Sequence, residues 1–270
     1  MANQHAPMMV NDTGLAGKVV IVTGGSSDGE GIGNGKAAAI LSARAGASVA
    51  VVGRRRDAAQ DTVDYIEREG GTACVVTGDV TDEESCKHIV QETVERFGRL
   101  DGLDNNVGEG HPGITTNMDM ETWRRYHRLN VESQVMMSKY TIPAMVETAG
   151  GGSIVNISSM SALRPKGNAL IYSSTKGEII YLSQAMAVDH AKQNIRVNCV
   201  IIGPVFTPTV GGEGMSAERR AQRAAASLLG EGNGWDTGYL VRYLLSDQAR
   251  WMTGQAIAID GGVSLVGPAR

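Results

Sequence analysis

The 270-residue chain contains few residues that could form disulfides or a metal site. Its three cysteines, Cys74, Cys86 and Cys199, are odd in number and have no ligand-like spacing. This predicts free thiols in a reducing compartment, and hence a cytoplasmic protein. The five histidines also lack partners at metal-ligand spacing, so we expect no metal ion.

Long apolar runs and a strong charge of one sign are also missing. No segment approaches the roughly 18 uncharged apolar residues of a membrane span. The first residues lack a basic start and an apolar run, so we expect no secretion signal and no membrane partner. The net charge of −4 provides no general attraction to nucleic acid, and Arg54–Arg56 is the only concentrated basic feature.

Short β-branched runs alternate with longer helical patterns along most of the chain. Nearly continuous apolar strands joined through helices predict a doubly wound parallel α/β sheet of about seven strands. We expect one domain over residues 15–270, preceded by a flexible arm at 1–14. Residues 207–234 interrupt the alternation with a Gly-, Ala- and Arg-rich segment, which we expect to be a mobile substrate lid.

A glycine-rich loop follows the first predicted strand, in "IVTGGSSDGEGIGNGKAA". Gly24 and Gly31 are separated by six residues, and Gly31-Ile32-Gly33 opens a helix. In a doubly wound sheet this loop lies where ligands bind, and glycines let its backbone approach a pyrophosphate at the helix N-terminus. On this loop alone, an ordinary strand-to-helix turn is the alternative.

Four motifs in a fixed order, "TGGSS…GIG", "NNVG", "YSSTK" and "DGG", give the chain a recognisable pattern from about Gly17 to Val263. The chain thereby resembles the short-chain dehydrogenase/reductase family. The resemblance implies a Rossmann-type fold, a nicotinamide cofactor, and hydride transfer between a small-molecule alcohol and a ketone. It also implies a homotetramer or homodimer paired through two long helices, which the apolar excess of "VESQVMMSKYTIPAMV" supports.

The resemblance also implies which residues contact the cofactor. Residues 79 and 80 bracket the adenine, and residues 106 to 108 line the ribose. The loop "IIGPVFT" holds the nicotinamide carboxamide. In this loop Ile202 replaces the family's usual proline, which puts the rigidity of the loop in question. The expected contacts are Gly24, Ser26, Ser27, Gly31, Ile32, Gly33, Arg54, Arg55, Asp79, Val80, Asn106, Val107, Gly108, Tyr172, Lys176, Gly203, Val205 and Thr207.

The end of the second strand bears on the choice between NAD and NADP. Gly53 stands where NAD-dependent sites carry an acid, and Arg54 and Arg55 follow it. Two neighbouring arginines can bind a 2′-phosphate, so we favour NADP(H). The alternative is a basic turn that lies in solvent and contacts no phosphate. Glu30, with Asp28 nearby, is negatively charged and argues against a bound 2′-phosphate, so NAD(H) stays the alternative cofactor. The family usually has three residues where this chain has Gly25–Glu30, so three extra residues either lengthen the loop near the ribose or form a surface insertion.

Tyr172 and Lys176 are four residues apart, which places them on one face of a helix. A nearby ammonium should lower the tyrosine pKa from its usual value of about 10 and fit the phenol for proton transfer. By resemblance, Ser159, 13 residues before Tyr172, orients the substrate, and Asn130 holds a water that links the lysine to solvent. A solvent-facing Asn130 is the alternative.

Two other functions remain open for this sequence. One is reduction of a C=C bond by an enoyl reductase, although that branch tends to space its tyrosine and lysine more widely. The other is a non-catalytic cofactor-binding sensor, against which both Tyr172 and Lys176 argue. His111 in "GEGHPG" either faces the substrate or is an ordinary loop histidine.

Overall fold

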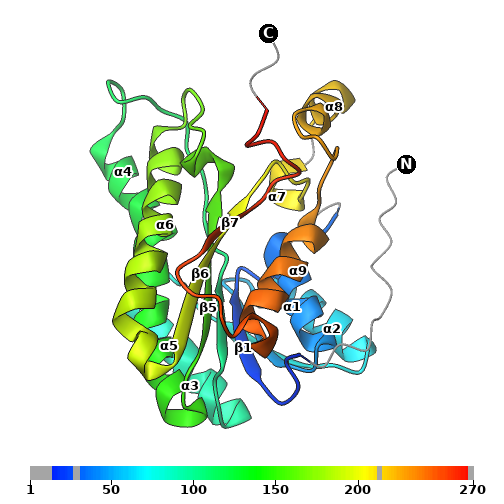
Figure 1. Cartoon of the computed structure of the whole chain (residues 1–270), viewed down its shortest axis with the longest axis vertical. Helices are drawn as coiled ribbons and strands as arrows, with labels where there is room; N and C mark the ends of the chain where they lie inside the picture. Colours follow the sequence, from blue (N-terminus) through cyan, green and yellow to red (C-terminus); the bar gives the residue numbers. More distant parts are fainter. Residues whose placement is uncertain (1–13, 27–30, 212–214, 267–270) are drawn as a thin grey trace.

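The computed structural model describes residues 14–26, 31–211 and 215–266. Its seven strands are parallel and form one sheet in the order β3-β2-β1-β4-β5-β6-β7 (Figure 1). This confirms the predicted doubly wound Rossmann-type sheet. The strands are β1 Val19–Thr23, β2 Ser48–Gly53, β3 Thr72–Thr77, β4 Gly102–Asn105, β5 Gly152–Ser159, β6 Ile195–Ile202 and β7 Ala256–Ile259.

Helices connect the strands as the alternation of patterns predicted. They are α1 Asn34–Arg44, α2 Arg56–Arg68, α3 Glu83–Phe97, α4 Met120–His127, α5 Ser133–Ala149, α6 Leu170–His190, α7 Pro208–Gly211, α8 Ala217–Ala225 and α9 Gly234–Leu245. A π-helical turn, Arg128–Glu132, joins α4 to α5. Such turns are frequent at functional sites.

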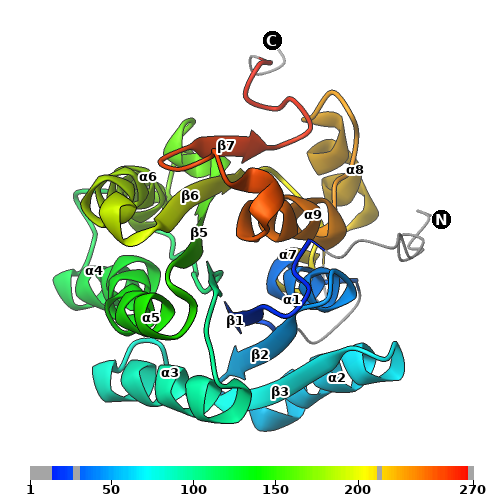
Figure 2. The same ribbon diagram turned by 60° about the horizontal axis from the view of Figure 1, so that its bottom comes forward.

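The sheet is covered on both faces (Figure 2). Helices α1, α2 and α9 pack on one face, and α3, α5 and α6 on the other. Because side chains alternate along a strand, the run Val19–Thr23 sends Val20 and Val22 to the first core and Val19 and Ile21 to the second. A strand buried on both faces therefore needs an unbroken apolar run, as this sequence has.

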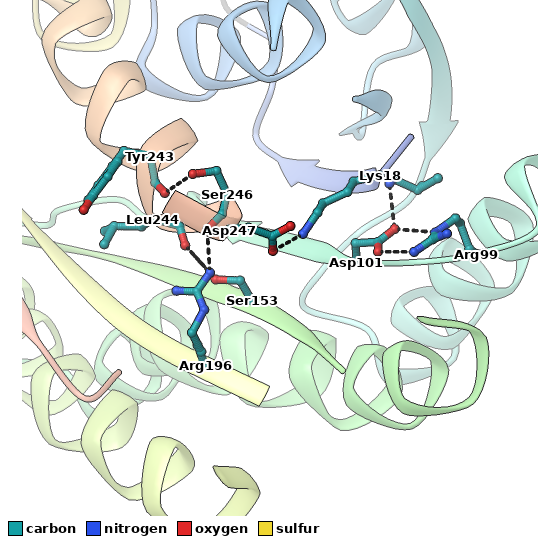
Figure 3. Close-up of polar contacts among 10 residues, drawn as sticks. Lys18, Arg99, Asp101, Ser153, Arg196, Tyr243, Leu244, Ser246 and Asp247 are labelled. Atoms are coloured by element: carbon teal, nitrogen blue, oxygen red, sulfur yellow. Dashed lines mark hydrogen bonds and ion pairs between the residues drawn. The ribbon is translucent and has the colours of Figure 1, made fainter. Parts of the chain in front are cut away.

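A polar network lies at the amino-terminal ends of the strands (Figure 3). Arg196 at the start of β6 donates hydrogen bonds to the carbonyls of Leu244 and Ser246 at 2.8 and 3.0 Å, which satisfies the last turn of α9. Ser153 in β5 donates to the same Leu244 carbonyl at 2.9 Å, and Lys18 pairs with Asp247. These contacts fix α9 against the sheet and leave the carboxyl ends of the strands free for a ligand.

Several expectations concern features outside the sheet. The first 13 residues of the expected arm lie outside the described residues, whereas Leu15 is fully buried and its N–H donates to the Ala45 carbonyl. Within the described ranges, no helix combines the length and the apolar character needed to cross a bilayer. All three cysteines are buried free thiols.

Candidate active site

A cleft of about 1480 Å³ opens at the carboxyl ends of the strands. Its walls come from the glycine loop, the segment after β4, the end of β5, helix α6, the loop after β6, helix α8 and the C-terminal segment. Single-ligand pockets usually measure about 300–1,000 Å³, so this cleft has room for a dinucleotide and a second molecule. Of the expected site residues, it brings together Gly24, Ser26, Gly33, Asn106, Gly108, Ser159, Tyr172, Lys176, Gly203, Val205 and Thr207.

The glycine loop forms a close-fitting cradle at one end of the cleft. Gly24 has φ +64°, a conformation that favours glycine, and its carbonyl accepts a bond from the Asn106 side chain at 3.3 Å. A Cβ at Gly35 would lie 2.4 Å from the same carbonyl, so α1 can begin this close to β1 only without a side chain there. Backbone held this way at a helix N-terminus fits a pyrophosphate, and with it a dinucleotide.

The adenosine end of this site is formed by the ends of β1, β2 and β3. A Cβ at Gly53 would lie 3.2 Å from the Ser26 hydroxyl, so the glycine loop passes directly over the end of β2. Arg54 is exposed and close enough to Asp79 to contribute to its lowered pKa. Burial, the largest single effect, raises this pKa, but hydrogen bonds from Thr81 to the Asp79 carboxylate, at 2.8 and 2.9 Å, outweigh it together with the charges of Arg54 and Arg128.

Some expected cofactor contacts do not line the described cleft. Gly31 and Ile32 pack toward Phe206 and the first core, and Val80 and Val107 pack in or against the second. Arg54, Arg55 and Asp79 lie beyond the Ser26 end of the cleft. Ser27, the acidic residues Asp28 and Glu30, and most of the three-residue insertion lie outside the described residues.

Tyr172, Ser159 and Lys176 meet at the other end of the cleft. Tyr172 and Lys176 project from the first two turns of α6, and the Lys176 Nζ lies 5.8 Å from the tyrosine ring centroid. Ser159, the last residue of β5, shares a hydrogen bond with the Tyr172 hydroxyl. Its neighbour Ser158 instead donates to the Lys176 carbonyl at 2.6 Å, whereas the Ser159 oxygen accepts from the Ser161 N–H at 3.2 Å, which leaves the Ser159 proton for the phenol or a reacting group.

The electrostatics of the pair differ from the prediction. Burial raises the pKa of the Tyr172 phenol above its usual value, and the bond to Ser159 opposes this only in part. Burial also lowers the pKa of Lys176 to about 8. The lysine Nζ donates to the Ile157 carbonyl at 2.8 Å rather than to the phenol, so in this arrangement it does not produce the expected lowering of the tyrosine pKa.

Asn130 lies in the π-helical turn and is fully buried, so the solvent-facing alternative is wrong. Its side chain accepts from the Glu109 N–H at 2.8 Å and donates to the Glu109 carbonyl at 2.9 Å and to Thr175 at 3.0 Å. A Cβ at Gly108 would lie 2.8 Å from Lys176 Nζ and 3.2 Å from Asn130 Oδ1. Asn130 thus fixes the loop after β4 against the lysine, and its expected role in holding a water stays a prediction.

Backbone hydrogen bonds hold the loop after β6, in which Ile202 replaces the usual proline. Gly203 donates to the Ile259 carbonyl and Val205 donates to the Gly203 carbonyl, at 2.9 and 2.8 Å. A Cβ at Gly203 would lie 2.4 Å from the Asp260 Cα, so the "DGG" segment packs directly on this loop. The arrangement presents Val205 and Thr207 to the cleft.

The structure adds cleft residues that sequence reasoning did not single out. Glu109 follows the cofactor-lining motif, Arg164 and Lys166 follow β5, and Arg219 and Arg223 lie on α8. The only available signal was the arginine content of the expected lid. His111 does not line the described cleft; its ring stacks near Tyr126 with centroids 5.0 Å apart.

Comparison with known proteins defines the class to which this fold and cleft belong. Residues 25–264 match the family model described as enoyl-(acyl carrier protein) reductase. The uncharacterized oxidoreductase YhdF of Bacillus subtilis is 36% identical over 92% of this chain and 84% of its own length. The chain belongs to the short-chain dehydrogenase/reductase family of oxidoreductases, whose fold implies a nicotinamide cofactor.

Two solved structures show how far the likeness extends. A putative short-chain dehydrogenase/reductase from Burkholderia xenovorans superposes with a TM-score of 0.89 at 36% identity, covering 94% of this chain and 99% of that one. A 7α-hydroxysteroid dehydrogenase complexed with NADH and 7-oxo glycochenodeoxycholic acid superposes with a TM-score of 0.85 at 33% identity, covering 92% and 94%. The predicted family and fold are therefore confirmed.

Proposed function

We propose that the protein is an NAD(P)-dependent oxidoreductase that interconverts a secondary alcohol and a ketone. The observation that supports this most strongly is the meeting of Tyr172, Ser159 and Lys176 in the cleft whose other end is the glycine cradle. The bound nicotinamide would supply or accept the hydride. All other steps fall to side chains of this chain.

Tyr172 acts as the general acid in reduction and the general base in oxidation. Its raised pKa keeps the phenol protonated at neutral pH, so it can donate a proton to the alkoxide oxygen as negative charge develops there. The Ser159 hydroxyl, which bonds the phenol in this structure, would turn its proton to the same oxygen when substrate binds and stabilise its charge. Lys176, whose pKa of about 8 lies near neutrality, would return a proton to the phenolate that Tyr172 becomes in reduction, and solvent would then reprotonate the lysine.

Reduction of a C=C bond is the second candidate, favoured by the description of the matching family model. The spacing of four residues between Tyr172 and Lys176, with Ser159 bonded to the phenol, supports carbonyl chemistry instead. A non-catalytic sensor would have no need of this buried constellation. The test is oxidation of NADPH and NADH with a ketone panel, including a 7-oxo steroid, and an enoyl thioester panel. Turnover of the thioesters alone would overturn the proposal.

We propose NADP(H) as the preferred cofactor, with NAD(H) as the alternative. Arg54 and Arg55 are exposed beside Gly53, where a 2′-phosphate would be accommodated, but Asp79 offsets part of the charge of Arg54. Replacing both arginines by alanine should weaken NADP binding by roughly 1.5–3 kcal/mol for each arginine–phosphate hydrogen bond removed, and should leave NAD binding nearly unchanged. Dissociation constants of both cofactors for the parent and the double variant test this. If the parent prefers NAD, and the double variant binds each cofactor as tightly as the parent does, the two arginines are merely solvated.

We propose a homotetramer or homodimer that pairs through the outer faces of α5 and α6. Tyr181 and Val188 lie two turns apart on α6 and are 76% and 79% exposed, and Val135 on α5 is 43% exposed. Light scattering of the purified protein should report two or four subunits, and Val188→Glu should shift it toward the monomer. A parent protein that is monomeric at micromolar concentration would contradict the proposal.

A further inference from the structure

Four basic side chains besides Lys176 line the cleft. We call Arg164, Lys166, Arg219 and Arg223 the basic rim. They come from two separate segments, the turn after β5 and helix α8, and all four line the cleft that contains Tyr172. Glu109 is the only acidic residue among the described residues that line it. The described lining of the cleft therefore carries an excess of positive charge.

Helix α8 divides its arginines between two roles. Arg220 stacks over the Phe206 ring at 3.7 Å and binds Glu231 through two bonds of 2.6 and 2.7 Å, so its charge is used within the fold. Arg219 and Arg223, one turn apart, lie with Gln222 on the face that lines the cleft. Helix α8 lies beside the C-terminal segment at the carboxyl end of the sheet (Figure 1).

The charges of the rim are not neutralised by carboxylates of the described chain. Arg164 donates to the carbonyls of Val263 and Val266, and Arg223 donates to the Val205 carbonyl at 3.4 Å. Neither Arg219 nor Lys166 has an ion-pair partner within the described ranges. Burial lowers the pKa of Arg223, and repulsion from Arg219 adds to this against the attraction of Glu231.

Holding two like charges one turn apart on a helix face is unfavourable unless an anion joins them. We propose that the substrate carries an oxyanion, such as a carboxylate, away from its reacting carbonyl, and that Arg219 and Arg223 bind this group. Arginine pairs suit carboxylate and phosphate through parallel hydrogen bonds. The inference rests on the proposed ketone chemistry for where the substrate reacts, but the binding of the anion is separate from that chemistry.

Substrate pairs that differ only in charge test the proposal. Aliphatic keto acids of increasing length would be compared with their methyl esters, as substrates and as ligands measured by calorimetry with the cofactor present. The parent should prefer the acid in kcat/KM by roughly tenfold or more for each arginine that binds the carboxylate. In the double variant Arg219→Gln and Arg223→Gln this preference should disappear, and Arg223→Lys should retain part of it.

The control is Lys192→Gln, which removes a positive charge from the exposed turn before β6, at the opposite end of the sheet. The Lys192→Gln variant should still prefer the acid. If the preference came from the overall positive charge of the protein and not from contact with Arg219 and Arg223, this variant would prefer the acid less. A melting curve for each variant confirms that it is folded.

The outcomes separate the two proposals. If the parent binds and turns over acid and ester equally well, the proposal that the basic rim binds a substrate anion is wrong, but the proposed ketone chemistry is unaffected. Acid binding that needs the two arginines, without turnover of either compound, would support the rim and count against the ketone chemistry. Loss of cofactor affinity in the double variant with an unchanged acid preference would assign the arginines to the cofactor pyrophosphate and overturn the proposal.

Discussion

Replacing Tyr172 by phenylalanine is expected to abolish turnover while the cofactor still binds. The substitution removes the proton donor and keeps the aromatic ring, so the half-buried site beside Ser159 stays packed. General acid–base catalysis contributes about 10²- to 10⁴-fold, and loss of the phenol should lower kcat and kcat/KM together by roughly 10³-fold. Steady-state kinetics with the best ketone of the panel, and cofactor titration by fluorescence, measure both parts of the prediction.

Tyr239→Phe is the matched control for this experiment. Tyr239 is 39% exposed on α9 and does not line the described cleft, so removing its hydroxyl should leave activity close to that of the parent. Activity of the Tyr172→Phe variant within tenfold of the parent would show that another group transfers the proton. The assignment of Tyr172 would then be wrong.

The sequence predicts the sheet well because its signals are local. A run such as Val19–Thr23 is apolar on both faces, and the glycines that end it are adjacent in the chain. The same locality places Tyr172 and Lys176, since a spacing of four residues fixes their common helix face. These features need no knowledge of distant segments.

Other features depend on contacts between segments far apart in the chain. Asn130 bonds to the backbone of Glu109, 21 residues away, and Arg164 bonds to the Val263 carbonyl, 99 residues away. No spacing rule predicts these pairs, so the structural role of Asn130 and the cleft position of Arg164 emerged only from the fold. The direction of the Tyr172 pKa shift was missed for the same reason, because burial depends on the whole site.

Asp104 is the clearest case of a residue that its local pattern does not explain. It lies fully buried in β4 beside Val22 of β1 and Val155 of β5. Its carboxylate oxygens have no hydrogen-bond partner within the described ranges, and burial raises its pKa well above the usual value. A neutral, protonated Asp104 is therefore the form compatible with this core.

Lys176→Met is expected to remove activity and stabilise the cofactor-free protein at neutral pH. The ammonium lies in a site that lowers its pKa to about 8, against about 10.4 in an unfolded chain. The folded state therefore bears the full cost of the buried charge, about 3 kcal/mol, below pH 8. Leaving the Ile157 carbonyl without its donor offsets about 1–3 kcal/mol of this gain, so the variant should be more stable than the parent by up to about 2 kcal/mol at pH 7.

The pH dependence shows whether that charge is the cause. Above pH 8 the folded lysine loses its proton while the unfolded one keeps it, so the parent gains stability until about pH 10.4 and the methionine variant does not. Urea unfolding of both proteins between pH 7 and 10.5 should show the advantage of the variant shrinking and then reversing, since only the missing hydrogen bond to the Ile157 carbonyl then separates the two proteins. A difference that stays constant across this range would mean that packing, and not the buried ammonium, sets the stability of the site. Turnover should fall by at least about 10²-fold at every pH, because the methionine can supply no proton to the site that Tyr172 shares.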